Sequence, residues 1–125
     1  MNRDLQSLLD MLQSAEIVIS YLEGITEKQF YHDGPQLQDA VIRRLLVIGE
    51  AANRVSEGKR LSLTDIEWPQ VRGMRNRLVH EYDEIDLAIV WQTAQSIIPD
   101  LIIKLTNAIP SELSRDKIED IGDRE

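Results

Sequence analysis

The 125-residue chain contains no cysteine and few aromatic residues, and these shortages exclude several classes of protein. Without cysteine there are no disulfides, no thiolate zinc sites and no cysteine nucleophiles. Aromatic residues make up only 5% of the chain, so aliphatic side chains must fill its core. No apolar run approaches the roughly 18 residues that a membrane helix needs, and the first residues lack the apolar segment of a signal peptide. We expect a soluble, cytoplasmic protein that does not contact membranes.

The chain is also short of positive charge. Its 14 basic residues are outnumbered by 22 acidic ones, which gives a net charge of −8. Proteins that coat nucleic acid without sequence preference gain affinity from many Lys and Arg contacts to phosphates, so that class is disfavoured. The charge still allows an enzyme that contacts a few phosphates in a local basic pocket, and it suits a protein whose partners are proteins.

Apolar residues recur at steps of three and four along most of the chain, a spacing typical of helices. The pattern predicts helices over 4–23, 37–56 and 69–81, and a last long helix that begins after Asp86 and is kinked or restarted at Pro99. No segment alternates as a strand does. We therefore predict one all-α domain over 1–110, an antiparallel bundle of four to five helices. The charged residues 111–125 are predicted to form a flexible tail.

The remaining segments are predicted to connect these helices. Residues 25–35 contain Gly and Pro and are expected to form a loop, and 56–62 a polar connection. Gly49 and its alanine neighbours are small enough for another backbone to approach closely. Trp68 and Trp91 are expected in the core or at an interface.

The segment RGMRNRLVHEY gathers three arginines and a histidine in an otherwise acidic chain. On one continuous helix, Arg72, Asn76 and His80 would lie within about 80° of one another. Arg75 would lie about 140° from His80, a gap that a second copy across a dimer axis would close. Tyr82 follows the predicted helix, and we expect its phenol to fold back toward His80.

These side-chain types suit RNA cleavage by transesterification. An imidazole that titrates near neutral pH can take the proton of the ribose 2′-hydroxyl or donate one to the leaving oxygen. A guanidinium can hold the phosphate and stabilise the charge that grows on it. The sequence offers no cluster of His, Asp and Glu with metal-ligand spacing, so we predict neither a metal site nor a cofactor.

A structural role is the alternative interpretation of the same residues. The arginines would then pair at the surface with carboxylates such as Glu67, Glu81 and Glu84, and a histidine at a helix C-terminus is favoured by the helix dipole. His32, the other histidine, is interpreted as a solvated residue of the 25–35 loop.

The run from Arg75 to Tyr82 matches without gaps the Arg-x4-His-x-Tyr motif of HepT-like HEPN toxins, and its flanks resemble that family too. Residues 40–56, AVIRRLLVIGEAANRVS, resemble the family's second helix. Trp68-Pro69 resembles the start of its motif helix, and IDLAIVWQT the start of the next one. The resemblance covers roughly residues 1–108, which is nearly the whole predicted domain.

The resemblance implies a homodimer with a shared RNA-cleaving cleft, paired with an MntA-like nucleotidyltransferase antitoxin. Arg75 and His80 would be catalytic, with Asn76 as a supporting polar residue. Tyr82 would be the site to which the antitoxin transfers AMP. Arg72 and Glu50 are further candidate supporting residues. Arg43 shares a helix face with Glu50, so a purely structural pair is the alternative for that glutamate.

Three functions compete at this point. The first is an RNA-cleaving toxin of a type II/VII-like toxin–antitoxin system: a metal-independent endoribonuclease silenced by AMP transfer. The second is a non-catalytic nucleotide-binding or scaffolding partner of a minimal nucleotidyltransferase. The third is a structural helical dimer. The acidity favours the second, and the intact motif favours the first.

Overall fold

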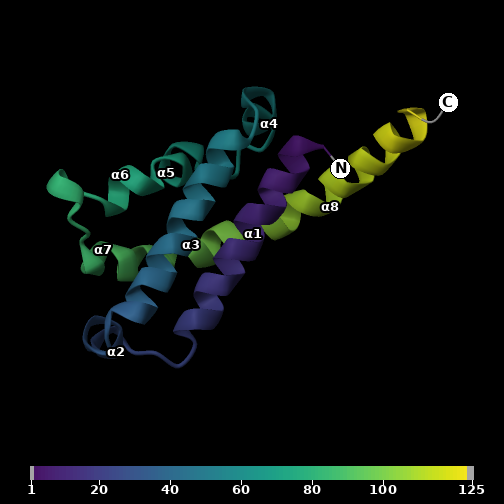
Figure 1. Cartoon of the computed structure of the whole chain (residues 1–125). Helices are drawn as coiled ribbons and strands as arrows, with labels where there is room; N and C mark the ends of the chain where they lie inside the picture. Colours follow the sequence, from purple (N-terminus) through teal and green to yellow (C-terminus); the bar gives the residue numbers. More distant parts are fainter. Residues whose placement is uncertain (1, 124–125) are drawn as a thin grey trace.

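In the computed structural model, which describes residues 2–123, every regular element is helical, and the only β contact is an isolated bridge between Val79 and Ile85 (Figure 1). The elements are α1 (Arg3–Leu22), α2 (Glu27–His32), α3 (Pro35–Arg54), α4 (Glu57–Ser62), α5 (Trp68–Arg72), α6 (Met74–Leu78), the 3-10 turn η1 (Glu81–Asp83), α7 (Leu87–Gln92), the π-helical turn η2 (Thr93–Ile97) and α8 (Ile98–Asp123). The all-α prediction is confirmed.

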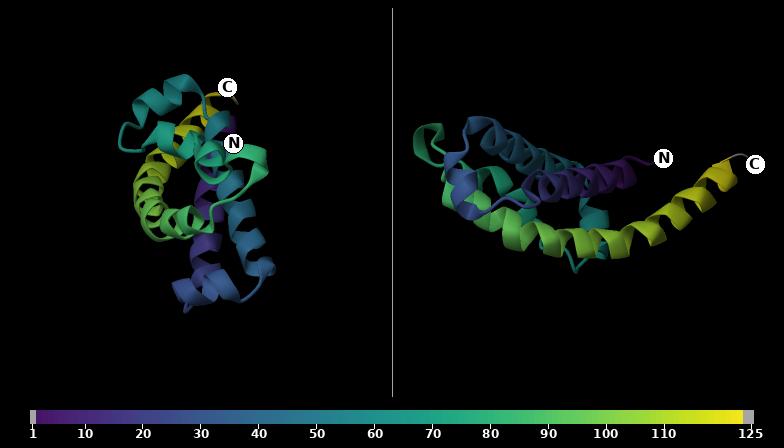
Figure 2. Two further views of the ribbon diagram at one scale, coloured as in Figure 1. Left: turned by 90° about the vertical axis from the view of Figure 1, so that its left-hand side faces the viewer. Right: turned by 90° about the horizontal axis from the view of Figure 1, so that it is seen from below.

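The core lies between three long helices. α1 and α3 run antiparallel side by side, and α8 packs on α1 (Figures 1 and 2). Their facing side chains are fully buried, among them Leu8, Met11, Leu45, Ile48 and Leu105. Truncating one such side chain to alanine typically costs about 2–5 kcal/mol. This core therefore fixes α3, which supports the motif segment (residues 72–82).

The motif segment packs closely on α3 at Gly49. A Cβ at Gly49 would lie 3.0 Å from the Cβ of Met74 and 3.4 Å from the carbonyl oxygen of Val71. The predicted close approach is thus confirmed. The tryptophan predictions are confirmed as well. Trp68 is buried and donates its indole N–H to the carbonyl of Leu63 at 3.0 Å, and Trp91 packs against the core as predicted.

Two predicted connections contain short helices instead. Within 25–35, Thr26 and Gln29 form a capping box that begins α2. His32 is accordingly the last residue of a helix rather than a loop residue. Within 56–62, the Ser56 hydroxyl caps α4 and donates to Asp4 at 2.7 Å, which ties α4 to α1. The signal for both helices is the capping residue, because neither segment has an extended apolar face.

The single helix predicted over 69–81 is wrong in two respects. It is divided into α5 and α6 at Gly73, and it ends at Leu78. Gly73 donates its N–H to the Pro69 carbonyl at 3.0 Å, and a Cβ on this glycine would lie 2.9 Å from the same oxygen. The break therefore fits glycine and would crowd any other residue. His80 lies beyond the helix in extended backbone.

The last helices follow the prediction at their start. Asp86 caps α7 by accepting from the N–H groups of Ala88 and Ile89. The π-helical turn η2 precedes Pro99, and α8 then continues the helix. A π-turn is a known way to accommodate a local disruption of the helical hydrogen bonds.

Contrary to the sequence pattern, α8 does not end near residue 110. It passes through Pro110 and extends to Asp123, and its C-terminal part projects past the rest of the molecule (Figure 2). Buried Ile109 and Glu112 lie on either side of this proline, and the Glu112 carboxylate accepts from Lys59 of α4 at 2.6 Å. These contacts hold the helix in place across the proline. Residues 124–125 of the predicted tail lie outside the described residues. Within 2–123 no helix is long and apolar enough to cross a membrane.

Candidate active site

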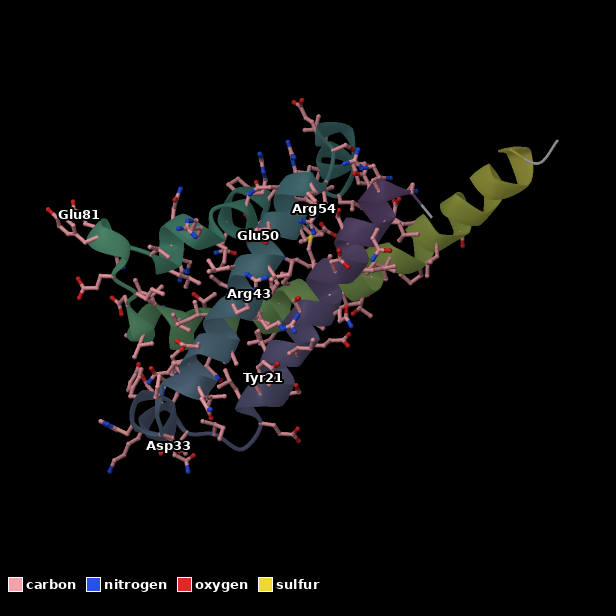
Figure 3. All side chains as sticks on the ribbon, viewed as in Figure 1. Tyr21, Asp33, Arg43, Glu50, Arg54 and Glu81 are labelled. Atoms are coloured by element: carbon pink, nitrogen blue, oxygen red, sulfur yellow. The ribbon has the colours of Figure 1, made fainter. Side chains whose placement is uncertain are left out.

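A small cleft lies where α3 meets α5 and α6. It is lined by Leu46, Gly49, Glu50, Asn53, Arg72 and Arg75. The Arg72 Nε donates to the Asn53 Oδ1 at 3.0 Å, so that guanidinium is held against α3. Arg75 is exposed and has no hydrogen bond or ion pair among the described residues. The cleft therefore presents one anchored and one free guanidinium beside the Glu50 carboxylate, which Figure 3 labels on α3.

His80 lies on a tight loop that follows α6. The bridge between Val79 and Ile85 closes the loop, and the His80 N–H donates to the Glu84 carbonyl at 2.7 Å. The loop projects from the body of the molecule, with Glu81 at its tip (Figure 3). The exposed His80 side chain borders two open hollows, one shared with Tyr82 and the other with residues 85–88. Solvent can therefore reach the imidazole.

Tyr82 has a left-handed backbone and a fully exposed side chain. Its φ of 63° is the only positive value at a non-glycine residue among those described. Its side chain is 99% exposed, so the prediction that the phenol folds back toward His80 is wrong. A left-handed conformation costs an L-residue about 1–2 kcal/mol, and such strain is concentrated at functional sites.

The structure divides the predicted site residues into two groups. Arg72, Arg75 and Glu50 share the cleft, whereas His80 and Tyr82 share the loop. The common face predicted for Arg72 and His80 does not exist, because the helix breaks at Gly73 and ends before His80.

The two remaining polar residues of the motif helix, Asn76 and Arg77, line neither the cleft at Arg75 nor the two hollows beside His80. Asn76 is exposed. Arg77 donates its Nε to the buried Thr93 hydroxyl at 2.9 Å, which ties α6 to η2. Arg77 therefore positions the helix rather than offering a free guanidinium.

Sequence reasoning missed Asn53, the residue that anchors Arg72. The available signal was its spacing, because residues three apart share a helix face and Asn53 lies three residues after Glu50. Among the side chains that the structure describes, no three His, Asp or Glu residues gather closely enough to hold a metal ion.

The other two tyrosines differ from Tyr82 in their surroundings. Tyr31 donates its hydroxyl to the Glu27 carboxylate at 2.8 Å, and this hydrogen bond raises the pKa of the Tyr31 phenol. Tyr21 is 38% exposed on α1. It lies on the far side of α3 from the motif loop, which is the loop that carries His80 and Glu81 (Figure 3). Tyr82 is thus the most accessible phenol in the described part of the chain.

An all-α bundle with an Arg-x4-His-x-Tyr motif at the end of a short helix is a HEPN-type domain. Residues 11–108 match the family described as Ribonuclease HepT-like. The chain therefore belongs to the HepT-like ribonuclease family.

Named relatives agree with this assignment. "Putative RNase TTE0752" of Caldanaerobacter subterraneus is 35% identical over 73% of this chain and 80% of its own length. "Putative RNase MJ1380" of Methanocaldococcus jannaschii is 32% identical over 79% of this chain and 91% of its own. "Probable ribonuclease HepT" of Thermococcus cleftensis is 31% identical over 75% of this chain and 84% of its own. No solved structure matches the chain.

Proposed function

We propose that this protein is a metal-independent endoribonuclease of a toxin–antitoxin system, in which Arg75 and His80 carry the reaction. The observation that supports this most is that both side chains are exposed to solvent. Arg75 is an exposed guanidinium without a partner, at the rim of a cleft that already holds Arg72. His80 is an exposed imidazole on a loop that is held by the backbone hydrogen bond from His80 to Glu84.

The proposed reaction needs only these side chains and the RNA. The ribose 2′-oxygen attacks the adjacent phosphorus while His80 accepts its proton, and the bond from phosphorus to the 5′-oxygen breaks. The leaving 5′-oxygen then takes up that proton from the His80 imidazolium, which returns His80 to its starting state. Arg75 binds the non-bridging oxygens, where negative charge increases in the transition state. The products are a 2′,3′-cyclic phosphate and a 5′-hydroxyl. Arg72, held by Asn53, binds a neighbouring phosphate of the RNA backbone.

The arrangement favours a homodimer as the active form. Arg75 and His80 line separate hollows in one protomer. A second copy would bring its own motif loop to the first copy's cleft, and so place both groups on one phosphate.

Alanine variants test the two catalytic roles. We expect His80→Ala to lower the RNA cleavage rate by about 10²–10⁴-fold, the usual effect of losing a positioned proton-transfer group. Arg75→Ala should lower it by about 10²–10³-fold, the usual effect of losing a donor that stabilises the charge of the transition state. Circular dichroism should remain unchanged, because both side chains are exposed. His32→Ala, at the end of α2, is the matched control and should cleave at the wild-type rate. Full activity in His80→Ala would refute the mechanism.

The regulation we propose is AMP transfer to Tyr82 by an MntA-like nucleotidyltransferase. The Tyr82 phenolic oxygen would attack the α-phosphorus of ATP, releasing pyrophosphate and the phenolic proton. Its 99% exposure gives a second active site full access to the oxygen. The added phosphate would then compete with RNA for Arg75, so inhibition would not require unfolding.

Mass spectrometry after coexpression with such a nucleotidyltransferase tests this regulation. The chain should gain one or more AMP units, and Tyr82→Phe should lose the gain, whereas Tyr31→Phe should keep it. An unchanged mass together with complete neutralisation would show that the partner inhibits by binding alone.

A further inference from the structure

The charged residues on the outward face of α3 lie at positions that are symmetric about one point of the helix, with opposite signs on the two sides. The other face of α3 is buried against α1, α5 and α6, with Leu45, Ile48 and Ala52 fully covered. On an ideal helix, the outward residues fall within an arc about 100° wide. They are Asp39, Arg43, Leu46, Val47, Glu50 and Arg54, of which the four charged ones are exposed. Figure 3 labels Arg43, Glu50 and Arg54 along this helix. We call these six residues the α3 stripe.

The α3 stripe is complementary to itself when reversed. Its midpoint lies between Leu46 and Val47, the two half-buried apolar residues. Arg43 and Glu50 lie equally far on either side of that midpoint, and Asp39 and Arg54 lie equally far beyond them. Each symmetric pair joins one acidic and one basic residue. In two antiparallel helices, residues at equal distances from the crossing point face each other, so the order would match every charge with its opposite.

We propose that a second copy of this chain docks on the α3 stripe, with the two α3 helices antiparallel and the two-fold axis at Leu46 and Val47. An isologous interface requires such self-complementarity, since each residue meets its symmetric counterpart. Arg43 of each copy then faces Glu50 of the other, and Asp39 faces Arg54. The apolar pair fills the centre, and the charges surround it as the polar rim of an interface. The contact spans roughly 22 Å of helix at 1.5 Å per residue.

The side chains of the stripe are available for such a contact. Arg43 and Glu50 make no hydrogen bond or ion pair among the described residues. Arg54 lies 3.5 Å from Asp10 of α1, but its side chain stays 51% exposed and can bind a second carboxylate. No residue of α3 needs to leave the core for the second copy to bind.

The interface would also complete the cleft. Glu50 lines the cleft with Arg72 and Arg75, so Arg43 of the second copy would enter beside it. That arginine would neutralise the one carboxylate next to the guanidinium groups, which raises the affinity of the cleft for phosphate. The inference thus rests on the homodimer of the proposed function and specifies its contact, but it does not depend on RNA cleavage.

Charge reversal with cross-rescue tests the interface. We expect the wild-type chain to be a dimer in sedimentation equilibrium, and Arg43→Glu and Glu50→Arg each to raise the dimer Kd by about tenfold or more, since each places two like-charged pairs in contact. Mixing the two variants should restore dimers, because both pairs are then of opposite charge. The double variant should dimerise alone. Lys28→Glu and Glu16→Arg make the same charge changes on α2 and α1, and should not affect the Kd.

Several outcomes would overturn the proposal. A monomeric wild-type chain excludes it, and so does a dimer that both single variants leave intact. Loss of dimers in the single variants without recovery in the mixture also excludes it, provided circular dichroism shows that the variants are folded. A dimer that follows the predicted pattern but cleaves no RNA leaves the interface standing and refutes only the proposed activity.

Discussion

At Gly49, where α3 contacts the motif segment, an added methyl group should bring none of the stability that it usually gives to a helix. In an open helical position, Gly→Ala stabilises a helix by about 1 kcal/mol. At Gly49 the new Cβ would lie 3.0 Å from the Met74 Cβ, whereas carbon atoms normally approach to about 3.5–4.0 Å. The α6 backbone must therefore retreat by about half an ångström. Overpacking of this kind costs about 1–3 kcal/mol. Gly49→Ala should thus leave the free energy of unfolding unchanged or lower it by up to about 2 kcal/mol.

Gly58 of α4 provides the matched comparison, because a Cβ there would have no neighbour within 4 Å. Gly58→Ala should raise the free energy of unfolding by up to about 1 kcal/mol. Urea denaturation followed by circular dichroism at one fixed protein concentration measures both variants. A stabilisation of Gly49→Ala equal to that of Gly58→Ala would show that α6 moves away freely, and would refute the view that α3 fixes the motif segment.

Two further predictions concern charge and backbone strain. Lys59→Met removes the 2.6 Å ion pair with the Glu112 carboxylate, which is 4% exposed, and should cost about 1.5–3 kcal/mol in urea denaturation, the usual contribution of a hydrogen bond to a charged group. Lys104→Met removes only the more exposed pair with Asp100 and should have little effect on the free energy of unfolding; equal losses in the two variants would contradict the burial argument. Tyr82→Gly should raise the free energy of unfolding by up to about 1 kcal/mol, because glycine adopts the left-handed backbone at no steric cost. Tyr82→Ala keeps the strain and should give no such gain, so a comparable gain in both variants would contradict the prediction.

The long helices were predictable because their stability comes from an apolar face whose period is visible in sequence. α1 and α3 begin and end within two residues of the predicted bounds. The close approach at Gly49 followed from residue size, and the cap of α7 from Asp86. Each of these features depends on residues that are near one another in the chain.

The features that were missed depend on local backbone geometry or on distant contacts. The break at Gly73 and the left-handed Tyr82 each result from one residue's φ and ψ values, which leave no periodic signal. α8 continues past Pro110 beside buried Ile109 and Glu112, and the partner of that carboxylate, Lys59, lies far away in sequence. The ideal-helix calculation already placed Arg75 away from His80, but their separation into two hollows also depends on the end of α6 at Leu78, which leaves no periodic signal.

The chemistry of the RNA ends formed by the purified protein in excess EDTA tests the central claim most directly. A reaction carried by His80 and Arg75 needs no metal ion, so the RNA should still be cut. Every new 3′ end should carry a 2′,3′-cyclic phosphate, and every new 5′ end a free hydroxyl that polynucleotide kinase can label directly. Cleavage that stops in EDTA and returns with Mg²⁺, leaving 3′-hydroxyl and 5′-phosphate ends, would contradict the account.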